Sequence, residues 1–164
     1  MLNEIDTLDS YEVGAFPTIK NIQVVCEDKY LPSYANDTDA CMDLKLKIET
    51  GKDLLDVAES KVYSTGLKIK VPKNHIMMIF PRSSTGFKLS CMLANTTAII
   101  DEGYRDEIKL KIFNYGNKEI ILEDGQRIAQ FVILPRPTLN LIQVVEDINF
   151  KEGDRGGGIG STGK

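Results

Sequence analysis

The chain of 164 residues contains a single histidine, no tryptophan and only three cysteines. With His75 alone, a histidine-ligated metal centre and a Ser/His/Asp triad are both excluded. The cysteines, Cys26, Cys41 and Cys91, are scattered and form no CxxC pair, so we expect neither a zinc site nor a disulfide framework. This cysteine usage favours a reducing, cytoplasmic environment. Any catalysis therefore has to rely on carboxylates, arginines and bound ions.

Long apolar runs and excess positive charge are also missing. No stretch approaches the ~20 apolar residues that span a bilayer, and the first residues lack the basic start and apolar run of a signal peptide. A net charge of −4 argues against a nucleic-acid partner, which selects a basic surface. Hydrophobic residues at 42% and charged residues at 27% are typical of a globular protein. We expect one domain with a substantial core and no membrane partner.

Apolar residues recur mainly with a period of two. In "DLKLKIE" the residues Leu44, Leu46 and Ile48 alternate with charged ones, and "EIKLKIF" repeats the pattern. Further strands are expected in "IKNIQVV", "GLKIKVP", "IMMIF", "EIIL", "RIAQFVIL" and "NLIQVV", several of them separated by turn signals such as "EDGQ". Helix is expected only as a turn or two in "DLLDVAE" and a short piece around "SSTGFKLS". The pattern predicts an all-β sandwich or barrel, with a jelly roll among the candidates.

The chain divides into three segments by composition. Residues 1–18 resemble an N-terminal extension, residues 19–150 form the expected β-domain, and residues 151–164 form a glycine-rich end. Glycine-rich ends are commonly frayed, but bare glycine amides can also close on an anion. The composition of this end alone does not separate the two interpretations.

Two polar clusters follow apolar runs and are candidate site residues. Arg82, Ser83 and Ser84 suit a phosphate chain, because a guanidinium fork and two hydroxyls can donate to several oxygens; a serine-rich turn is the alternative. Asp101 follows an apolar run and is a candidate general base toward water, while Tyr104 could stack a flat or sugar-like group. The alternative is a polar hairpin in which Asp101 accepts hydrogen bonds from turn amides.

Two further clusters of polar residues belong to apolar strands, one at the start of a strand and the other within a strand. Asp39 and Asp43 flank a strand start and could serve a hydrated Mg²⁺, although solvated edge carboxylates are more frequent in general. Arg127 and Gln130 lie inside an apolar strand, where polar groups need partners. They either brace the core or reach a ligand.

The order and spacing of these clusters resemble the trimeric dUTPase family from about residue 19 to residue 164. The five ordered motifs of that family resemble "DACMDL", "PRSS", "NTTAIIDEGY", "GQRIAQFV" and "RGGGIGSTG" of this chain. The resemblance implies a jelly-roll-like β-barrel or sandwich and a homotrimer in which three subunits build each active site. It also implies hydrolysis of dUTP to dUMP and pyrophosphate, with Mg²⁺ on the triphosphate, and a mobile C-terminal arm that closes over a neighbouring site.

The resemblance assigns roles by position. Asp101 would orient or deprotonate the attacking water, Asp43 would hold hydrated Mg²⁺ through water, and Tyr104 would pack under the deoxyribose. Phosphate contacts would come from Arg82, Ser83, Ser84 and Gln130, uracil contacts from Asn95 and the backbone of Ile99, Ile100 and Lys109, and arm contacts from Arg155, Ile159, Ser161 and Thr162.

The chain departs from the family pattern at three positions. Ile159 stands where the family usually carries a phenylalanine stacked on the base, so that either Ile159 merely covers the uracil or Phe87 or another aromatic stacks on it. Cys41 replaces a usual glycine of the first motif, and Asp106 replaces the glycine that often follows the Tyr-x pair, which adds negative charge near the hairpin.

Two alternatives to this function differ in class. A dCTP deaminase shares the fold, but its pattern has a histidine before the Ile-Asp pair, a tryptophan in place of Tyr104, and a glutamate where Lys111 stands here. The second alternative is a regulatory binding protein on the same scaffold, for which the chain offers no long inserted segment. Neither alternative fits the five motifs as well.

Overall fold

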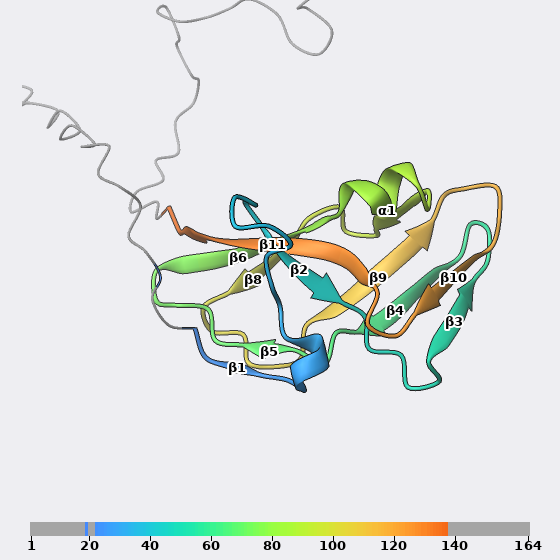
Figure 1. Ribbon diagram of the computed structural model, residues 1–164. Helices are drawn as coiled ribbons and strands as arrows, with labels where there is room; N and C mark the ends of the chain where they lie inside the picture. The colour runs from blue at the N-terminus through green and yellow to red at the C-terminus, as the bar shows by residue number, and fades with distance from the viewer. Residues whose placement is uncertain (1–18, 20–21, 138–164) are drawn as a thin grey trace, which may run out of the picture.

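The computed structural model describes residue 19 and residues 22–137, which form a nearly all-β domain. The strands are β1 (Val24–Val25), β2 (Met42–Lys45), β3 (Lys52–Leu55), β4 (Ser60–Ser64), β5 (Lys68–Ile69), β6 (His75–Pro81), β7 (Cys91–Leu93), β8 (Ala98–Asp101), β9 (Lys109–Asn114), β10 (Ile120–Glu123) and β11 (Arg127–Pro135). One short α-helix, α1 (Ser83–Phe87), and one 3₁₀ turn (Asp28–Tyr30) interrupt them. The expected β architecture with very little helix is confirmed (Figure 1).

The strands pair antiparallel in four groups. A four-stranded sheet has the order β2-β11-β6-β8 and a three-stranded sheet the order β4-β9-β7, while β3 pairs with β10 and β1 with β5. The long strand β11 therefore lies between β2 and β6, which are far from each other in the sequence. β8 is an edge strand, so alternate backbone groups along its outer side are left for other partners.

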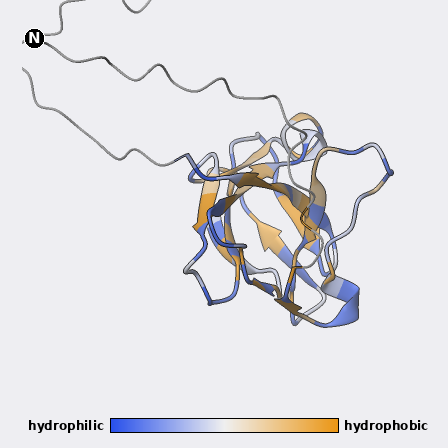
Figure 2. Ribbon diagram, turned by 90° about the vertical axis from the view of Figure 1, so that its left-hand side faces the viewer, coloured by the Kyte–Doolittle hydropathy of each residue, from blue (hydrophilic) through white to orange (hydrophobic). Residues whose placement is uncertain are grey.

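The alternating apolar residues point inward, as the sequence indicates. Leu44 and Leu46 are completely buried, Ile48 is nearly so, and Leu110 and Ile112 are buried from the facing sheet. Burial of each such side chain contributes about 1.5–3 kcal/mol. Figure 2 shows the apolar residues along the strands that surround the interior and polar ones in most of the connecting loops. Within the described ranges, no helix has the length and hydropathy to cross a membrane.

The prediction of a helical turn in "DLLDVAE" is wrong. Lys52–Leu55 is strand β3, which pairs residue by residue with β10, and Leu55 is completely buried. The chain then turns at Ala58, which has a left-handed φ of 60°. The partner strand β10 lies far along the chain, so a local pattern could not reveal it. The short helix expected around "SSTGFKLS" is confirmed as α1.

The turn between β10 and β11 is fastened by Asp124. One carboxylate oxygen accepts the Ile48 backbone N–H at 2.9 Å and the Tyr30 hydroxyl at 2.7 Å, and the other lies 3.2 Å from the Lys29 ammonium. The backbone hydrogen bond from Ile48, followed by those from Tyr30 and Lys29, holds the pKa of Asp124 below its usual value. The carboxylate thus ties the 3₁₀ turn to the end of the strand pair that carries Arg127 and Gln130.

Candidate active site

The sheet order brings three of the sequence motifs to one place. On β11, Gln130 lies opposite Asp43 of β2 on one side and opposite Phe80 of β6 on the other. Arg82 follows directly after β6 and precedes α1. The amide nitrogen of Gln130 donates to the Pro81 carbonyl at 3.4 Å. Carboxylate, guanidinium and amide therefore meet at the junction of β2, β6 and β11.

Asp43 is the charged centre of this junction. Its side chain is only 7% exposed, and its two oxygens lie 2.7 Å from Arg82 Nε and 3.1 Å from Arg127 Nη1. Its backbone N–H donates to the Ser33 carbonyl at 2.9 Å. A buried carboxylate is costly unless it is paired, and here two arginines share one carboxylate. The junction therefore carries a net positive charge, which suits an anionic ligand.

Arg82 is held in one orientation by three contacts. Nε faces Asp43, Nη1 donates to the Arg127 carbonyl at 3.2 Å, and the backbone N–H donates to the Ile128 carbonyl at 3.3 Å. A guanidinium has five N–H donors, so donors remain beyond those used in these two side-chain contacts. Fixed donors of this kind bind oxyanions without reorganising.

Helix α1 places the two candidate serines beside Arg82. Ser83 is exposed and Ser84 is half-buried at the start of the helix. Thr85, which is buried, donates from its hydroxyl to the Ile128 carbonyl at 2.6 Å and so fixes the helix against β11. Sequence reasoning missed Thr85 as a bracing residue, because a hydroxyl in a serine-rich turn gives no signal of a partner 43 residues away.

Arg127, one of the two polar residues within β11, contacts both other charged residues of the junction. Arg127 pairs with Asp43 and in addition offers its carbonyl to Arg82, so it braces the junction. Its side chain is 46% exposed, whereas that of Arg82 is 25% exposed. Arg82 is therefore the more deeply held of the two arginines.

A second group of candidate residues lines a hollow between β8 and β9. The cavity of about 430 Å³ is lined by Val62, Ala94, Asn95, Ala98, Lys109, Leu110 and Lys111. Asn95 and Lys109 thus lie at the same cavity, as the hairpin motif indicates. Ile99 and Ile100 lie opposite Met78 and Met77 of β6 on the edge strand β8. Free backbone donors and acceptors on such an edge can match the polar edge of a planar base.

Asp101 and Tyr104 occupy the turn that ends β8. Asp101 is exposed, and its carbonyl accepts the Tyr104 backbone N–H at 3.1 Å. The Tyr104 hydroxyl donates to the Glu107 carbonyl at 2.9 Å, and its half-buried ring packs against the core. The ring is therefore held at both ends, and the carboxylate of Asp101 is open to solvent and to substrate.

The two groups of residues do not meet within one chain. Asp101 lies opposite Ile76 at the start of β6, whereas Arg82 follows the end of that strand. The extended strand between these positions corresponds to roughly 20 Å. Figure 1 shows α1 at one end of β6 and the β8–β9 loop toward the other, beside β1 and β5. A single chain thus presents the candidate base and the candidate phosphate contacts as separate surfaces.

No cluster of three or more His, Cys, Asp or Glu side chains that could hold a metal ion occurs within residues 22–137. Asp43 is the candidate metal carboxylate at the junction described above, and both its oxygens face arginines. Mg²⁺ commonly binds through one or two carboxylates together with waters and substrate phosphates. The donor set therefore fits an ion that arrives on a polyphosphate and does not fit a complete protein cage.

Two of the three positions that depart from the family pattern, Cys41 and Asp106, have defined surroundings. Cys41 is half-buried, and burial, followed by the nearby Asp43 carboxylate, raises the pKa of its thiol. Asp106 is exposed on the β8–β9 loop. Phe87 is 93% exposed and lines a hollow of about 360 Å³ together with Arg82 and Ser83, apart from the cavity that contains Asn95. The candidate residues Arg155, Ile159, Ser161 and Thr162 lie outside the described residues.

Comparisons of the sequence give a consistent result. The dUTPase family profile matches residues 27–163. A deoxyuridine 5'-triphosphate nucleotidohydrolase of Clostridium tetani is 39% identical over 144 residues, which cover 87% of this chain and 95% of that protein. The corresponding protein of Escherichia phage T5 is 35% identical over 138 residues, which cover 81% of this chain and 91% of that protein.

Solved structures show the same fold. The dUTPase of Staphylococcus bacteriophage 80alpha superposes with a TM-score of 0.67 at 23% identity, covering 79% of this chain and 98% of that one. A mutant dUTPase from phage phi11 of S. aureus, described with a structural Mg(II) ion, gives a TM-score of 0.66 at 21% identity and covers 77% and 97%. The profile match and the sequence relatives together establish that the chain belongs to the dUTPase family.

Proposed function

We propose that this protein hydrolyses dUTP to dUMP and pyrophosphate by attack of water on the α-phosphorus. The observation that carries the proposal is that one chain of the dUTPase family presents two separate candidate binding surfaces. One is the cavity with Asn95 between β8 and β9, and the other is the positively charged junction of Asp43, Arg82, Arg127 and Gln130. The reaction would keep uracil out of DNA and supply dUMP.

The triphosphate binds at the junction of β2, β6 and β11. Arg82 supplies the principal positive charge, and Ser83, Ser84 and Gln130 supply further donors around it. Phosphoryl transfer depends mainly on positioning and charge neutralisation, so these side chains suffice without histidine. The ion pair of Arg82 with buried Asp43 supports this assignment, because it fixes the guanidinium before the anion arrives.

The deoxyuridine binds at the cavity between β8 and β9. Asn95 and the backbone of Ile99, Ile100 and Lys109 read the uracil edge, and a mismatched base would leave buried polar groups unpaired. Tyr104 packs under the deoxyribose and leaves little room for a 2′-hydroxyl. The fixed ring of Tyr104 and the edge position of β8 support this role.

Asp101 acts as the group that orients the attacking water and accepts its proton. Its exposed carboxylate at the end of β8 lies close in sequence to the residues that bind base and sugar. A general base of this kind contributes about 10²–10⁴-fold to the rate.

Mg²⁺ would enter with the triphosphate and neutralise part of its charge. Asp43 would hold the hydrated ion through water. Its pairing with two arginines supports contact through water, because each of its oxygens already forms an ion pair with a guanidinium.

The active form would be a homotrimer in which different copies contribute to one site. The separation of roughly 20 Å between Asp101 and Arg82 along β6 supports sharing, because both residues act on one triphosphate. The glycine-rich arm of residues 151–164 would close over a neighbouring site, where Arg155, Ser161 and Thr162 contact the terminal phosphates and Ile159 covers the base. Glycine permits the close backbone approach that this requires.

The three free cysteines support a reducing, cytoplasmic location.

The test is pyrophosphate release from dUTP, with dTTP, dCTP and UTP measured in parallel, for this chain and for Asp101→Asn. We expect release from dUTP alone and its loss in the variant. Conversion of dCTP to dUTP or dUMP would instead assign a deaminase. Release from no nucleotide by the folded protein with Mg²⁺ would contradict the proposal and leave a binding role.

A further inference from the structure

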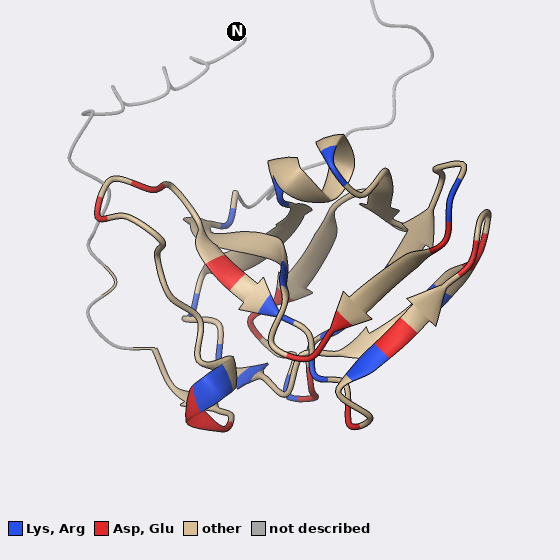
Figure 3. Cartoon of the chain, turned by 45° about the vertical axis from the view of Figure 1, so that its right-hand side comes forward, with Lys and Arg blue, Asp and Glu red and all other residues tan. Residues whose placement is uncertain are grey.

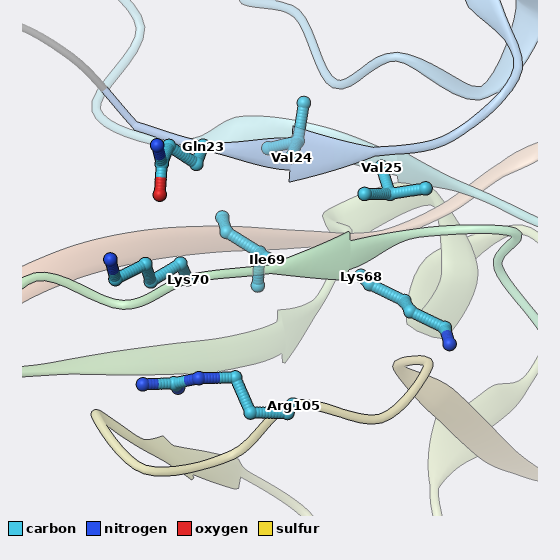
Figure 4. Close-up of a pocket in the computed structure, with 7 residues that line it drawn as sticks. All are labelled: Gln23, Val24, Val25, Lys68, Ile69, Lys70 and Arg105. Carbon is cyan, nitrogen blue, oxygen red and sulfur yellow. The ribbon is translucent and has the colours of Figure 1, made fainter.

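A small pocket outside the candidate active site lies between the β1–β5 strand pair and the β8–β9 loop. It has a volume of about 220 Å³ and is lined by Gln23, Val24, Val25, Lys68, Ile69, Lys70 and Arg105 (Figure 4). Val24 lies opposite Ile69 and Val25 opposite Lys68 in the antiparallel pair. Ile69 is buried, but Val25 remains 70% exposed, so apolar surface is left uncovered here. We call these seven residues the β1–β5 pocket.

The β1–β5 pocket carries three cations. Lys68 and Lys70 are exposed, and Arg105 is fixed because its Nη1 donates to the carbonyls of Glu102 at 2.6 Å and Tyr104 at 2.8 Å. Figure 4 shows Lys70 and Arg105 extending in the same direction, while Lys68 extends toward the other end of the pocket.

These cations lack carboxylate partners. Within the described part of the chain, none of the three forms an ion pair. The carboxylates of Glu102 and Glu107, on the same loop as Arg105, accept the backbone N–H groups of Asn74 and Gly66. Elsewhere both signs of charge are interspersed over the surface (Figure 3). The β1–β5 pocket is thus an apolar hollow lined by three cations that form no ion pair within the described residues.

The segment that precedes this pocket has the complementary composition. Residues 1–18 contain four carboxylates and no lysine or arginine, so they account for the whole formal charge of −4. The carboxylates are Glu4, Asp6, Asp9 and Glu12, and apolar residues such as Ile5, Leu8, Val13 and Phe16 lie among them. Gln23 follows Thr18 so closely that the connection spans at most ~17 Å.

We propose that the acidic segment of residues 1–18 docks on the β1–β5 pocket of its own chain. Its carboxylates face Lys68, Lys70 and Arg105, and its apolar residues cover Val24 and Val25. The short connection gives an effective concentration in the millimolar range, so individually weak contacts suffice.

The absence of tryptophan from the chain allows a direct test, which does not depend on dUTP hydrolysis. Phe16→Trp places the single tryptophan of the chain in the acidic segment, where it can be excited selectively at long wavelength. At low salt we expect blue-shifted emission and protection from acrylamide. Exposed ion pairs are weak individually, so reversing two cations with Lys70→Glu and Arg105→Glu should lower the docking constant about tenfold and shift the emission to the red. About 1 M NaCl should do the same, since the Debye length falls to ~3 Å.

Matched variants separate docking from misfolding. Neutralising the segment with Glu4→Gln, Asp6→Asn, Asp9→Asn and Glu12→Gln leaves the pocket unchanged and should give the same red shift. Lys88→Glu with Lys118→Glu makes an equal charge change at two other exposed lysines and should leave the emission unchanged. The proposal is overturned if Phe16→Trp emits as a solvent-exposed tryptophan or if the control pair shifts the emission equally. It is also overturned if the emission of Phe16→Trp copies shifts to the red when they assemble with an excess of copies that carry Lys70→Glu and Arg105→Glu and no tryptophan, which would assign the segment to a second copy.

Discussion

Replacing Asp43 by asparagine tests the assignment of the junction as a preorganised anion site. The substitution keeps the shape of the side chain and removes its charge. An amide has one acceptor oxygen, and its NH₂ group would face the second guanidinium. Arg82, which lies 2.7 Å from the carboxylate, and Arg127, at 3.1 Å, therefore cannot both be satisfied in Asp43→Asn.

The magnitude follows from the exposure of the three side chains. A hydrogen bond to a charged group contributes about 1.5–3 kcal/mol, and an exposed ion pair about 0.2–1 kcal/mol. Asp43 is buried and Arg82 is 25% exposed, whereas Arg127 is 46% exposed, so the Arg82 contact carries the larger share. We expect Asp43→Asn to lower the free energy of unfolding by about 2 kcal/mol, and Arg127→Gln by at most about 1 kcal/mol.

Urea unfolding at fixed protein concentration measures the first effect. With a slope of about 2 kcal/mol per M, the midpoint should move by about 1 M for Asp43→Asn and by half of that or less for Arg127→Gln. Because Arg82 loses its orienting partner, kcat/KM for dUTP should fall about 10- to 100-fold in Asp43→Asn, a loss of roughly 1.4–2.7 kcal/mol of transition-state stabilisation. Equal midpoints and equal kcat/KM in Asp43→Asn and the unaltered protein would refute the reasoning.

Three further outcomes are expected. Asp101→Asn should lower kcat by about 10²–10⁴-fold at unchanged thermal stability, while the exposed neighbour Asp106→Asn should change kcat little; pyrophosphate release and a melting curve decide this. The pKa of Asp124 is lowered in the folded protein by a backbone hydrogen bond and by Tyr30, so its carboxylate should stabilise the fold at pH values above the unfolded-state pKa of about 3.9. Urea unfolding at several pH values should show that the stability difference between the unaltered protein and Asp124→Asn disappears as the pH falls through the lower pKa of the folded state. Asn114→Leu should cost about 2–4 kcal/mol in urea unfolding, because the buried amide donates at 2.8 and 3.2 Å and accepts at 2.9 Å from backbone groups.

The strands are predictable from sequence wherever alternation is strong. Leu44, Leu46 and Leu110 lie on the core face because a strand has a period of two and only one face of each sheet is buried. β3 is not predictable in this way, because "DLLDVAE" also fits a helical turn and its pairing with Ile120–Glu123 is distant in sequence. Local patterns carry little information about partners that sequence-distant strands supply.

The candidate site is predictable as a set of residues and not as an arrangement. Asp43, Arg82 and Gln130 follow from the motifs, but their meeting depends on β11 lying between β2 and β6. The sequence permits both bracing and binding for Arg127, and it gives no sign of the ion pair that Arg127 forms with Asp43. The separation of Asp101 from Arg82 follows only from the register of β6 with β8.

That register has a genetic consequence if copies share their sites. A chain with Asp101→Asn retains its Arg82, and a chain with Arg82→Ala retains its Asp101, so two inactive proteins can each repair the other. In an equal mixture that assembles at random, about one quarter of the sites would receive both intact residues from different copies. Two loss-of-function alleles of this gene would then complement each other in one cell, whereas alleles altered in the same residue would not.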